Sequence, residues 1–127
     1  MKPKKQPTPA ELAILQVLWQ RGPSTVRDIH AALDGERPTG YTTVLKLMQI
    51  MTDKGLLARD EKQRAHIYRP RLPRVETQKQ LVADLLDRAF AGSAAQLVMQ
   101  ALSAKRASPQ ELAQIRRLLE QHERSQR

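Results

Sequence analysis

The stretch from Thr39 to Pro70 constrains the fold of this chain more than any other part of the sequence. Its first half has apolar residues at the i, i+3, i+4, i+7 spacing of a helix with one buried face. These residues are Val44, Leu47, Met48 and Met51. Two short runs follow, Leu56–Asp60 and Ala65–Arg69, and they predict the strands of a ribbon whose tip is Glu61–Arg64. A helix that leads directly into such a ribbon predicts the second half of a winged helix-turn-helix, which places its recognition helix in the DNA major groove.

The opposite face of the recognition helix is polar and carries candidate DNA contacts. Its side chains are two hydroxyls, one cation and one amide: Thr42, Thr43, Lys46 and Gln49. Such groups can reach phosphates and base edges without filling the groove. At the ribbon tip, Lys62 and Arg64 are candidate phosphate contacts. The alternative interpretation is that both sets are simply solvated surface.

Two further helices are predicted before the recognition helix. Thr8 and Glu11 have the spacing of a capping box at the start of the first, and the pair Gly22-Pro23 ends it. The second helix is short, from about Thr25 to Leu33, and also begins with a capping pair of hydroxyl and carboxylate. The segment Asp34–Pro38 is then the turn into the recognition helix.

The charge of the chain favours a polyanionic partner. Among its 127 residues are 22 Lys and Arg against 13 Asp and Glu, which gives a formal net charge of +9. The excess is concentrated in the first 74 residues, which hold 14 basic and 7 acidic side chains. A basic excess beside a recognition helix is typical of nucleic-acid-binding proteins. Residues 1–7 are predicted to be a flexible basic arm, and whether this arm contacts DNA is left open.

Several other classes of protein are disfavoured by the sequence. His30, His66 and His122 fall in separate predicted elements, and no Gly-rich phosphate loop or recognisable nucleophile and base pair is present. We therefore predict that the chain is not an enzyme and has no catalytic residue, cofactor or metal. The absence of cysteine excludes disulfides and thiolate metal sites, and it is compatible with the cytoplasmic location that we expect. A mean hydropathy of -0.57 without a long apolar run argues against membrane insertion.

The remainder of the chain, residues 71–127, predicts three amphipathic helices that form a dimerisation domain. So short a helical region has little chance of closing a core alone, and a second copy of the chain is the simplest partner. We therefore expect a mostly α protein, with a winged helix-turn-helix in residues 8–70 and a homodimer formed by residues 71–127. The predicted dimerisation residues are Leu81, Leu85, Leu86, Phe90, Leu97, Val98, Leu112, Ile115, Leu118 and Leu119.

Three motifs resemble the penicillinase-repressor family, the BlaI/MecI/CopY type of bacterial regulator. They are P-A-E-L-A-I-L-Q-V-L-W in the first helix, G-Y-T-T-V-L-K-L-M with D-K-G-L-L at the recognition helix, and R-A-H-I-Y-R-P on the ribbon. The resemblance covers roughly residues 7–121. It implies a transcriptional repressor that binds double-stranded DNA at a palindromic operator as a homodimer, with the wing gripping the backbone.

The resemblance also bears on how repression would be relieved. Copper-responsive relatives end in a cysteine-rich tail, so copper sensing by that route is excluded for this chain. Relatives that respond to beta-lactams are cut in the dimerisation region, at a place that aligns near Gln100-Ala101, and a membrane sensor protease would be the partner. The competing hypothesis is a winged-helix protein-interaction module without specific DNA binding. A steep fall of DNA affinity with salt would argue against that alternative.

Overall fold

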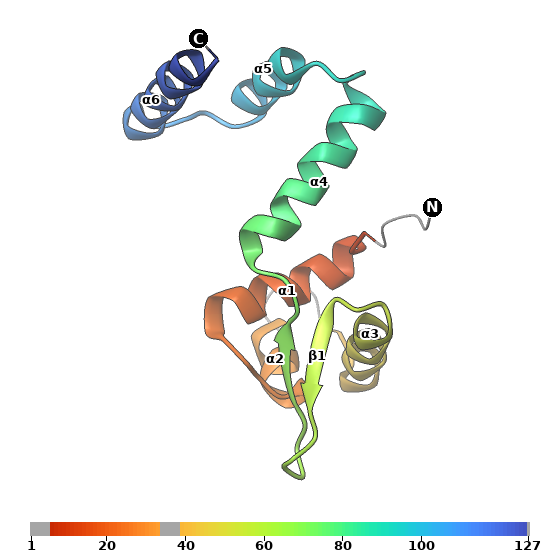
Figure 1. Cartoon of the computed structure of the whole chain (residues 1–127). Coiled ribbons are helices and arrows are strands. Elements are labelled where there is room, and N and C mark those ends of the chain that lie inside the picture. The colour runs from red at the N-terminus through yellow and green to blue at the C-terminus, as the bar shows by residue number, and fades with distance from the viewer. Residues whose placement is uncertain (1–5, 34–38, 127) are drawn as a thin grey trace. The chain divides into compact units, whose positions relative to one another are not determined.

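The structure, a computed structural model, describes residues 6–33 and 39–126 (Figure 1). The predicted arm at residues 1–7 lies outside this part except for Gln6 and Pro7, and so does the predicted turn Asp34–Pro38. Six helices and one antiparallel pair of strands are formed within it, which confirms the predicted mostly α fold class. The elements are α1 (Pro9–Arg21), α2 (Val26–Leu33), α3 (Tyr41–Asp53), β1 (Leu57–Asp60), β2 (Ile67–Pro70), α4 (Arg74–Ala89), α5 (Ala94–Ala104) and α6 (Pro109–Ser125).

The first two helices begin at the predicted caps. The Thr8 hydroxyl accepts a hydrogen bond from the Glu11 N–H at 3.2 Å, and the Glu11 carboxylate accepts from the Thr8 N–H at 2.9 Å. The same reciprocal pair joins Thr25 and Asp28 at 3.1 Å in both directions. Hydrogen bonds from Thr25 lower the pKa of the Asp28 carboxyl, so the cap remains charged at neutral pH. Helix α1 stops at Gly22, whose φ of 96° favours glycine.

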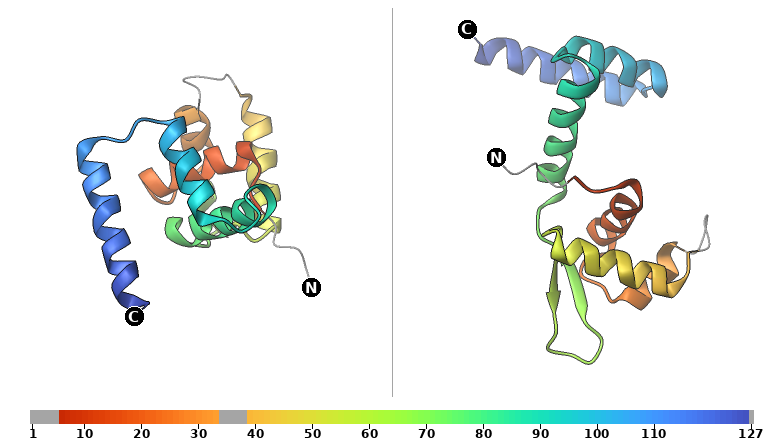
Figure 2. Two further views of the ribbon diagram at one scale, coloured as in Figure 1. Left: turned by 90° about the horizontal axis from the view of Figure 1, so that it is seen from above. Right: turned by 90° about the vertical axis from the view of Figure 1, so that its right-hand side faces the viewer.

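Helices α1, α2 and α3 lie beside the two strands (Figure 2), and one hydrophobic core holds these elements together. Its buried members are Ile14, Leu15, Leu18, Val26, Ile29, Val44, Met48, Met51, Leu57 and Tyr68. The predicted stripe of α3 is confirmed at three of its four positions, whereas Leu47 is only half-buried. Leu47 lies at the edge of the stripe, where it lines a hollow against the beginning of α1 instead of entering the core.

The predicted ribbon is a two-stranded wing whose second strand starts later than the sequence indicated. Leu57 pairs with Pro70 and Asp60 with Ile67, so the tip comprises residues 61–66 and not the four residues expected. A short bridge adds the α1–α2 loop to the wing, because Ser24 and Tyr68 exchange backbone hydrogen bonds of 3.0 and 2.8 Å. This bridge fixes the beginning of α2 beside the second wing strand.

The chain has two compact units, and the boundary between them lies between Val82 and Ala83, inside α4. The start of α4 therefore belongs to the winged-helix unit, and Thr77 is buried there. In the second unit, Ser108 and Glu111 form a capping box at the start of α6, with hydrogen bonds of 3.1 and 3.5 Å. No residue of α5 or α6 is buried, although both helices carry large apolar side chains.

Candidate nucleic-acid interface

The recognition helix α3 presents all four predicted DNA-contact residues to solvent. Thr42, Lys46 and Gln49 lie on the side opposite the core stripe, because each residue turns the helix by about 100°. Thr43 is also exposed but lies on one flank of the helix. There it lines a hollow of about 630 Å³ together with the beginning of α1 and Leu47. The four residues thus share the helix but not a single stripe.

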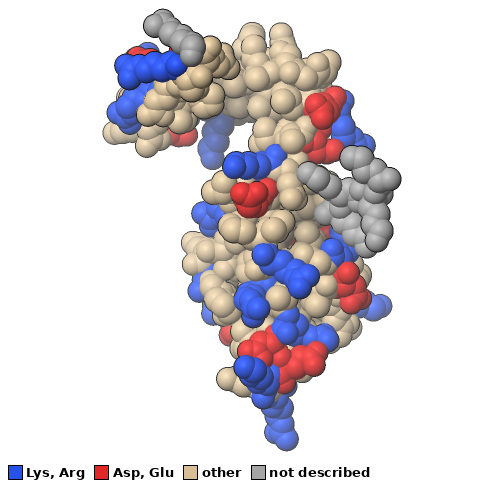
Figure 3. Space-filling model, in the orientation of Figure 1, with Lys and Arg blue, Asp and Glu red and all other residues tan. Residues whose placement is uncertain are grey.

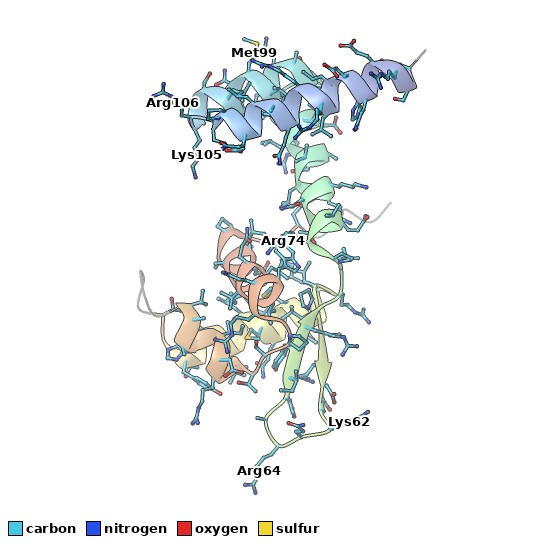
Figure 4. All side chains as sticks on the ribbon, turned by 90° about the vertical axis from the view of Figure 1, so that its left-hand side faces the viewer. Lys62, Arg64, Arg74, Met99, Lys105 and Arg106 are labelled. Carbon is cyan, nitrogen blue, oxygen red and sulfur yellow. The ribbon has the colours of Figure 1, made fainter. Side chains whose placement is uncertain are left out.

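The wing tip carries the other two predicted contacts. Lys62 and Arg64 are both exposed, and their side chains point in different directions away from the ribbon (Figure 4). Acidic groups lie close by: the Lys62 N–H donates to the Asp60 carboxylate at 3.0 Å, and Arg59 pairs with Glu61 at 2.6 Å. Figure 3 shows this mixture of charges at the wing end. Carboxylates therefore offset part of the positive charge of the wing tip.

A hollow of about 550 Å³ lies between α2, α3 and the wing, and sequence reasoning missed it. Its polar and cationic lining includes Arg27 from the first turn of α2 and Arg64 and His66 from the wing, with Thr25 at the cap of α2. The remaining lining residues are Val26, Tyr41, Leu45, Ala65 and Tyr68. The Ser24–Tyr68 bridge brings these distant segments together. To predict the hollow from the sequence, one would have had to know that the α1–α2 loop pairs with a strand 44 residues further along the chain.

An ion pair joins the beginning of α1 to the end of α3. Lys54 Nζ lies 2.7 Å from the Glu11 carboxylate and also donates to the carbonyl oxygen of Gln6 at 3.3 Å. Burial raises the pKa of the Glu11 carboxyl, but the hydrogen bonds from Lys54 and Thr8 outweigh this effect and lower the pKa overall. The charged pair thus helps to position the recognition helix from its C-terminal end.

The three histidines do not converge on a site. His30 lies in α2 against Tyr41, His66 lies in the wing, and His122 lies in α6. Within residues 6–33 and 39–126, no group of three or more His, Cys, Asp and Glu side chains is arranged to hold a metal. None of the helices in the described part of the chain is long and apolar enough to cross a membrane.

The predicted dimerisation residues lie on α4, α5 and α6, except Phe90, which follows α4 directly. All ten are half-buried or exposed. Figure 3 shows a surface with few charges around α5, a helix whose sequence contains no charged residue. The predicted cleavage residues Gln100 and Ala101 are both exposed and lie inside α5, so their backbone is helical.

Three helices followed by a two-stranded wing define a winged helix-turn-helix protein, with a recognition helix and a cationic hollow on the same unit. A family model described as penicillinase repressor matches residues 7–121, and the chain belongs to that family. The family is one of regulators and not of enzymes, as the sequence predicted.

The chain resembles two curated relatives, and a solved structure of similar fold is among its matches. The relatives, named Transcriptional regulator BlaI, come from Mycobacterium tuberculosis strains CDC 1551 / Oshkosh and ATCC 25618 / H37Rv. Each is 39% identical over 82 residues, which cover 64% of this chain and 56% of the relative, so the match spans little more than half of their length. The solution structure of monomeric Bacillus licheniformis BlaI with the blaP half-operator has a TM-score of 0.50 at 21% identity. The structural match covers 60% of this chain and 93% of the Bacillus licheniformis chain, and it shows that the two proteins share a fold.

Proposed function

We propose that the protein is a sequence-specific transcriptional repressor that binds double-stranded DNA at a palindromic operator as a homodimer. The observation that carries the proposal is the exposed polar face of α3 beside a hollow with two arginines. The names of the curated relatives and the half-operator bound to the Bacillus licheniformis protein support it. Such a repressor works in the bacterial cytoplasm, where the chromosome lies.

In this proposal, α3 enters the major groove and the wing lies against the flanking backbone. Thr42, Lys46 and Gln49 face base edges and phosphates, while Thr43 approaches the DNA from the flank of the helix. Lys62 and Arg64 neutralise phosphates at the wing. Residues 8–70 then form the DNA-binding part, and Arg27 joins the contacts that sequence reasoning proposed.

Residues 71–127 form the dimerisation part in this proposal. The support is the absence of any buried residue in α5 and α6, although Leu112, Leu118 and Leu119 expose 37%, 53% and 59% of their surface. Leaving several large side chains in water forgoes the free energy that burial supplies, about 25 cal/mol for each Å² of apolar surface. A second copy of the chain offers the same apolar faces and covers both sets at once.

Repression is relieved, in this proposal, by a signal or by proteolysis of the dimerisation part, with a membrane sensor protease system as the partner. A cut near Gln100-Ala101 requires α5 to open locally, because proteases act on extended backbone. Since α5 buries no residue, little free energy opposes this opening in a single chain. Mass spectrometry of the first fragments from limited proteolysis tests the site, and cuts confined to residues 69–74 would contradict it.

Replacing Lys46 with alanine tests the proposed function directly. Gel-shift titrations on a duplex selected by the full-length protein should give weaker binding, with a salt slope smaller by about one if Lys46 neutralises one phosphate. Thr43→Ala should also weaken binding, with a nearly unchanged thermal melt because the side chain is exposed.

The matched control is Lys79→Ala, which removes an exposed lysine of α4 and should keep the wild-type affinity. Wild-type affinity in both Lys46→Ala and Thr43→Ala would remove α3 from the interface. If the wild type shows neither a preference for a DNA sequence nor a DNA affinity that falls steeply with salt, the protein-interaction module is favoured instead.

A further inference from the structure

The first residue of the recognition helix is a large, exposed aromatic side chain. Tyr41 exposes 47% of its surface, and the helix has no side-chain cap before it. The ring of His30 packs edge-on against the Tyr41 ring, with centroids 5.8 Å apart and planes at 80°. This contact restricts the tyrosine ring without burying it. A solvent-exposed ring that is held in place is suited to contact a partner at a low cost in side-chain entropy.

The surroundings of Tyr41 combine an apolar floor with cationic neighbours. Leu45 lies one helical turn further along and is half-buried, so both residues line the same hollow. Arg27 and Arg64 line it from α2 and the wing, and both side chains are exposed. An apolar surface between two cations fits a strand of DNA, which has phosphates outside and base edges inside. The arginines attract the phosphate backbone of the DNA, and the apolar surface between them is suited to contact an apolar group of a base.

We propose that Tyr41 and Leu45 contact the methyl group of a thymine at a fixed position of each operator half-site. This inference rests on the proposed function and names a determinant of its specificity. The first residues of a recognition helix are those that meet base edges in the major groove. Among the four bases only thymine presents an apolar group there, its C5-methyl. An apolar pair at this position therefore selects thymine where a polar pair would select another base.

The test removes only that methyl group from the DNA. The operator is first selected from random duplexes with the full-length protein, and each thymine is then replaced in turn by uracil, which pairs identically. For the wild type we expect one thymine position in each half-site at which uracil lowers the DNA affinity. The expected decrease is about fourfold, the factor given by burial of one methyl group. In Tyr41→Ala the same uracil should have a clearly smaller effect, because only Leu45 of the pair that contacts the methyl remains.

Two further variants separate this contact from other roles of the residue. Tyr41→Phe keeps the ring and should keep both the affinity and the sensitivity to uracil. Ile50→Ala removes a similarly exposed apolar side chain, 46% exposed, from the far flank of α3 and should leave the uracil sensitivity unchanged. Circular dichroism checks that each variant is folded, and the exposure of both side chains predicts that it is.

The outcomes are distinct. Equal binding of all uracil duplexes by the wild type, or a uracil effect of undiminished size in Tyr41→Ala, would overturn the inference and leave the proposed repressor intact. A loss of affinity in Tyr41→Phe without any uracil effect would assign the tyrosine hydroxyl to a phosphate and also overturn it. If the wild type selects no sequence from the random duplexes, the proposed function fails and the inference fails with it.

Discussion

Glu11 connects the start of α1 to the end of the recognition helix through a single carboxylate. One of its oxygens accepts from the Thr8 N–H and lies 2.7 Å from Lys54 Nζ. The Glu11 side chain is 2% exposed and that of Lys54 is 20% exposed, so the pair is screened much less than a surface salt bridge. Removal of one partner leaves the other charge poorly solvated, which makes this pair sensitive to mutation.

We expect the stability of the protein to depend on pH through Glu11. Its folded pKa lies below the ordinary value of 4.5, so the stabilisation is complete above that value and is lost as the pH falls through the lowered pKa. Glu11→Gln should cost about 1–3 kcal/mol at pH 7 because Lys54 loses its charged partner. It should also flatten the fall of stability between neutral pH and the acid range.

Urea unfolding at a series of pH values measures both effects. Glu76→Gln is the control, because that side chain is 53% exposed and its contact with Lys79 is 4.0 Å long. If wild type and Glu11→Gln lose stability in parallel with falling pH, the carboxyl does not carry the dependence.

Arg27 is a candidate DNA contact that the structure adds to those predicted from the sequence. It lines the same hollow as Arg64 although 37 positions separate them in the chain. If a DNA strand occupies this hollow, Arg27→Ala should weaken operator binding as much as Arg64→Ala does. Each substitution should lower the salt slope by about one.

Fluorescence anisotropy titrations at several salt concentrations provide this measurement. Arg88→Ala removes an exposed arginine of α4, 77% exposed, and should leave affinity and slope unchanged. An effect of Arg64→Ala without any effect of Arg27→Ala would confine the contact to the wing.

Among the elements, those specified by local signals were predictable from the sequence. The capping box at Thr8 and the capping pair at Thr25 each depend on only four consecutive residues, and the structure contains both. The hollow beside α3 was not predictable, because it depends on the non-local pairing of Ser24 with Tyr68. The late start of β2 at Ile67 has a similar origin: register follows from pairing, and Asp60 pairs with Ile67 and not with Ala65.

The first residue of α4 contacts a side chain of α1, which local sequence did not indicate. The Arg74 guanidinium carbon lies 5.8 Å from the centre of the Trp19 ring, and Thr77 is 5% exposed. A cation over an indole contributes about 0.5–1 kcal/mol at an exposed site. We therefore expect Arg74→Ala to lower the stability of the winged-helix unit by about this amount.

Intrinsic fluorescence reports on this contact because Trp19 is the only tryptophan of the chain. Loss of Arg74 should change the emission of the folded protein, whereas Lys79→Ala, one turn or more along the same helix, should not. Identical spectra of the wild type and Arg74→Ala would mean that the guanidinium does not sit over the indole in solution.

At the scale of the whole molecule, burial among residues 6–33 and 39–126 is confined to the first unit. The ten buried apolar residues of this part of the chain lie from Ile14 to Tyr68, and no residue of α5 or α6 is buried. The first unit therefore has a core of its own, whereas α5 and α6 of the second unit bury none of their apolar side chains. This difference between the units is expected if a second copy of the chain buries the apolar side chains of the second unit in a dimer.

The dimer proposal predicts that a single charge on α6 separates dimerisation from folding. Leu119 is 59% exposed in one chain, so Leu119→Glu should leave the fold and thermal melt of the winged-helix unit nearly unchanged. In a dimer the same carboxylate would be buried without a partner, which costs several kcal/mol per ion and favours the monomer. Sedimentation equilibrium should then show a lower molecular mass than for the wild type.

Operator binding should follow from that change of mass. Affinity for a half-site should stay at the wild-type level, while affinity for the full palindrome should fall because the second contact no longer benefits from a high effective concentration. Gln121→Glu adds the same charge at an exposed polar position of α6 and should remain dimeric. A Leu119→Glu protein that stays dimeric and keeps its preference for the palindrome would show that this face of α6 is not the interface.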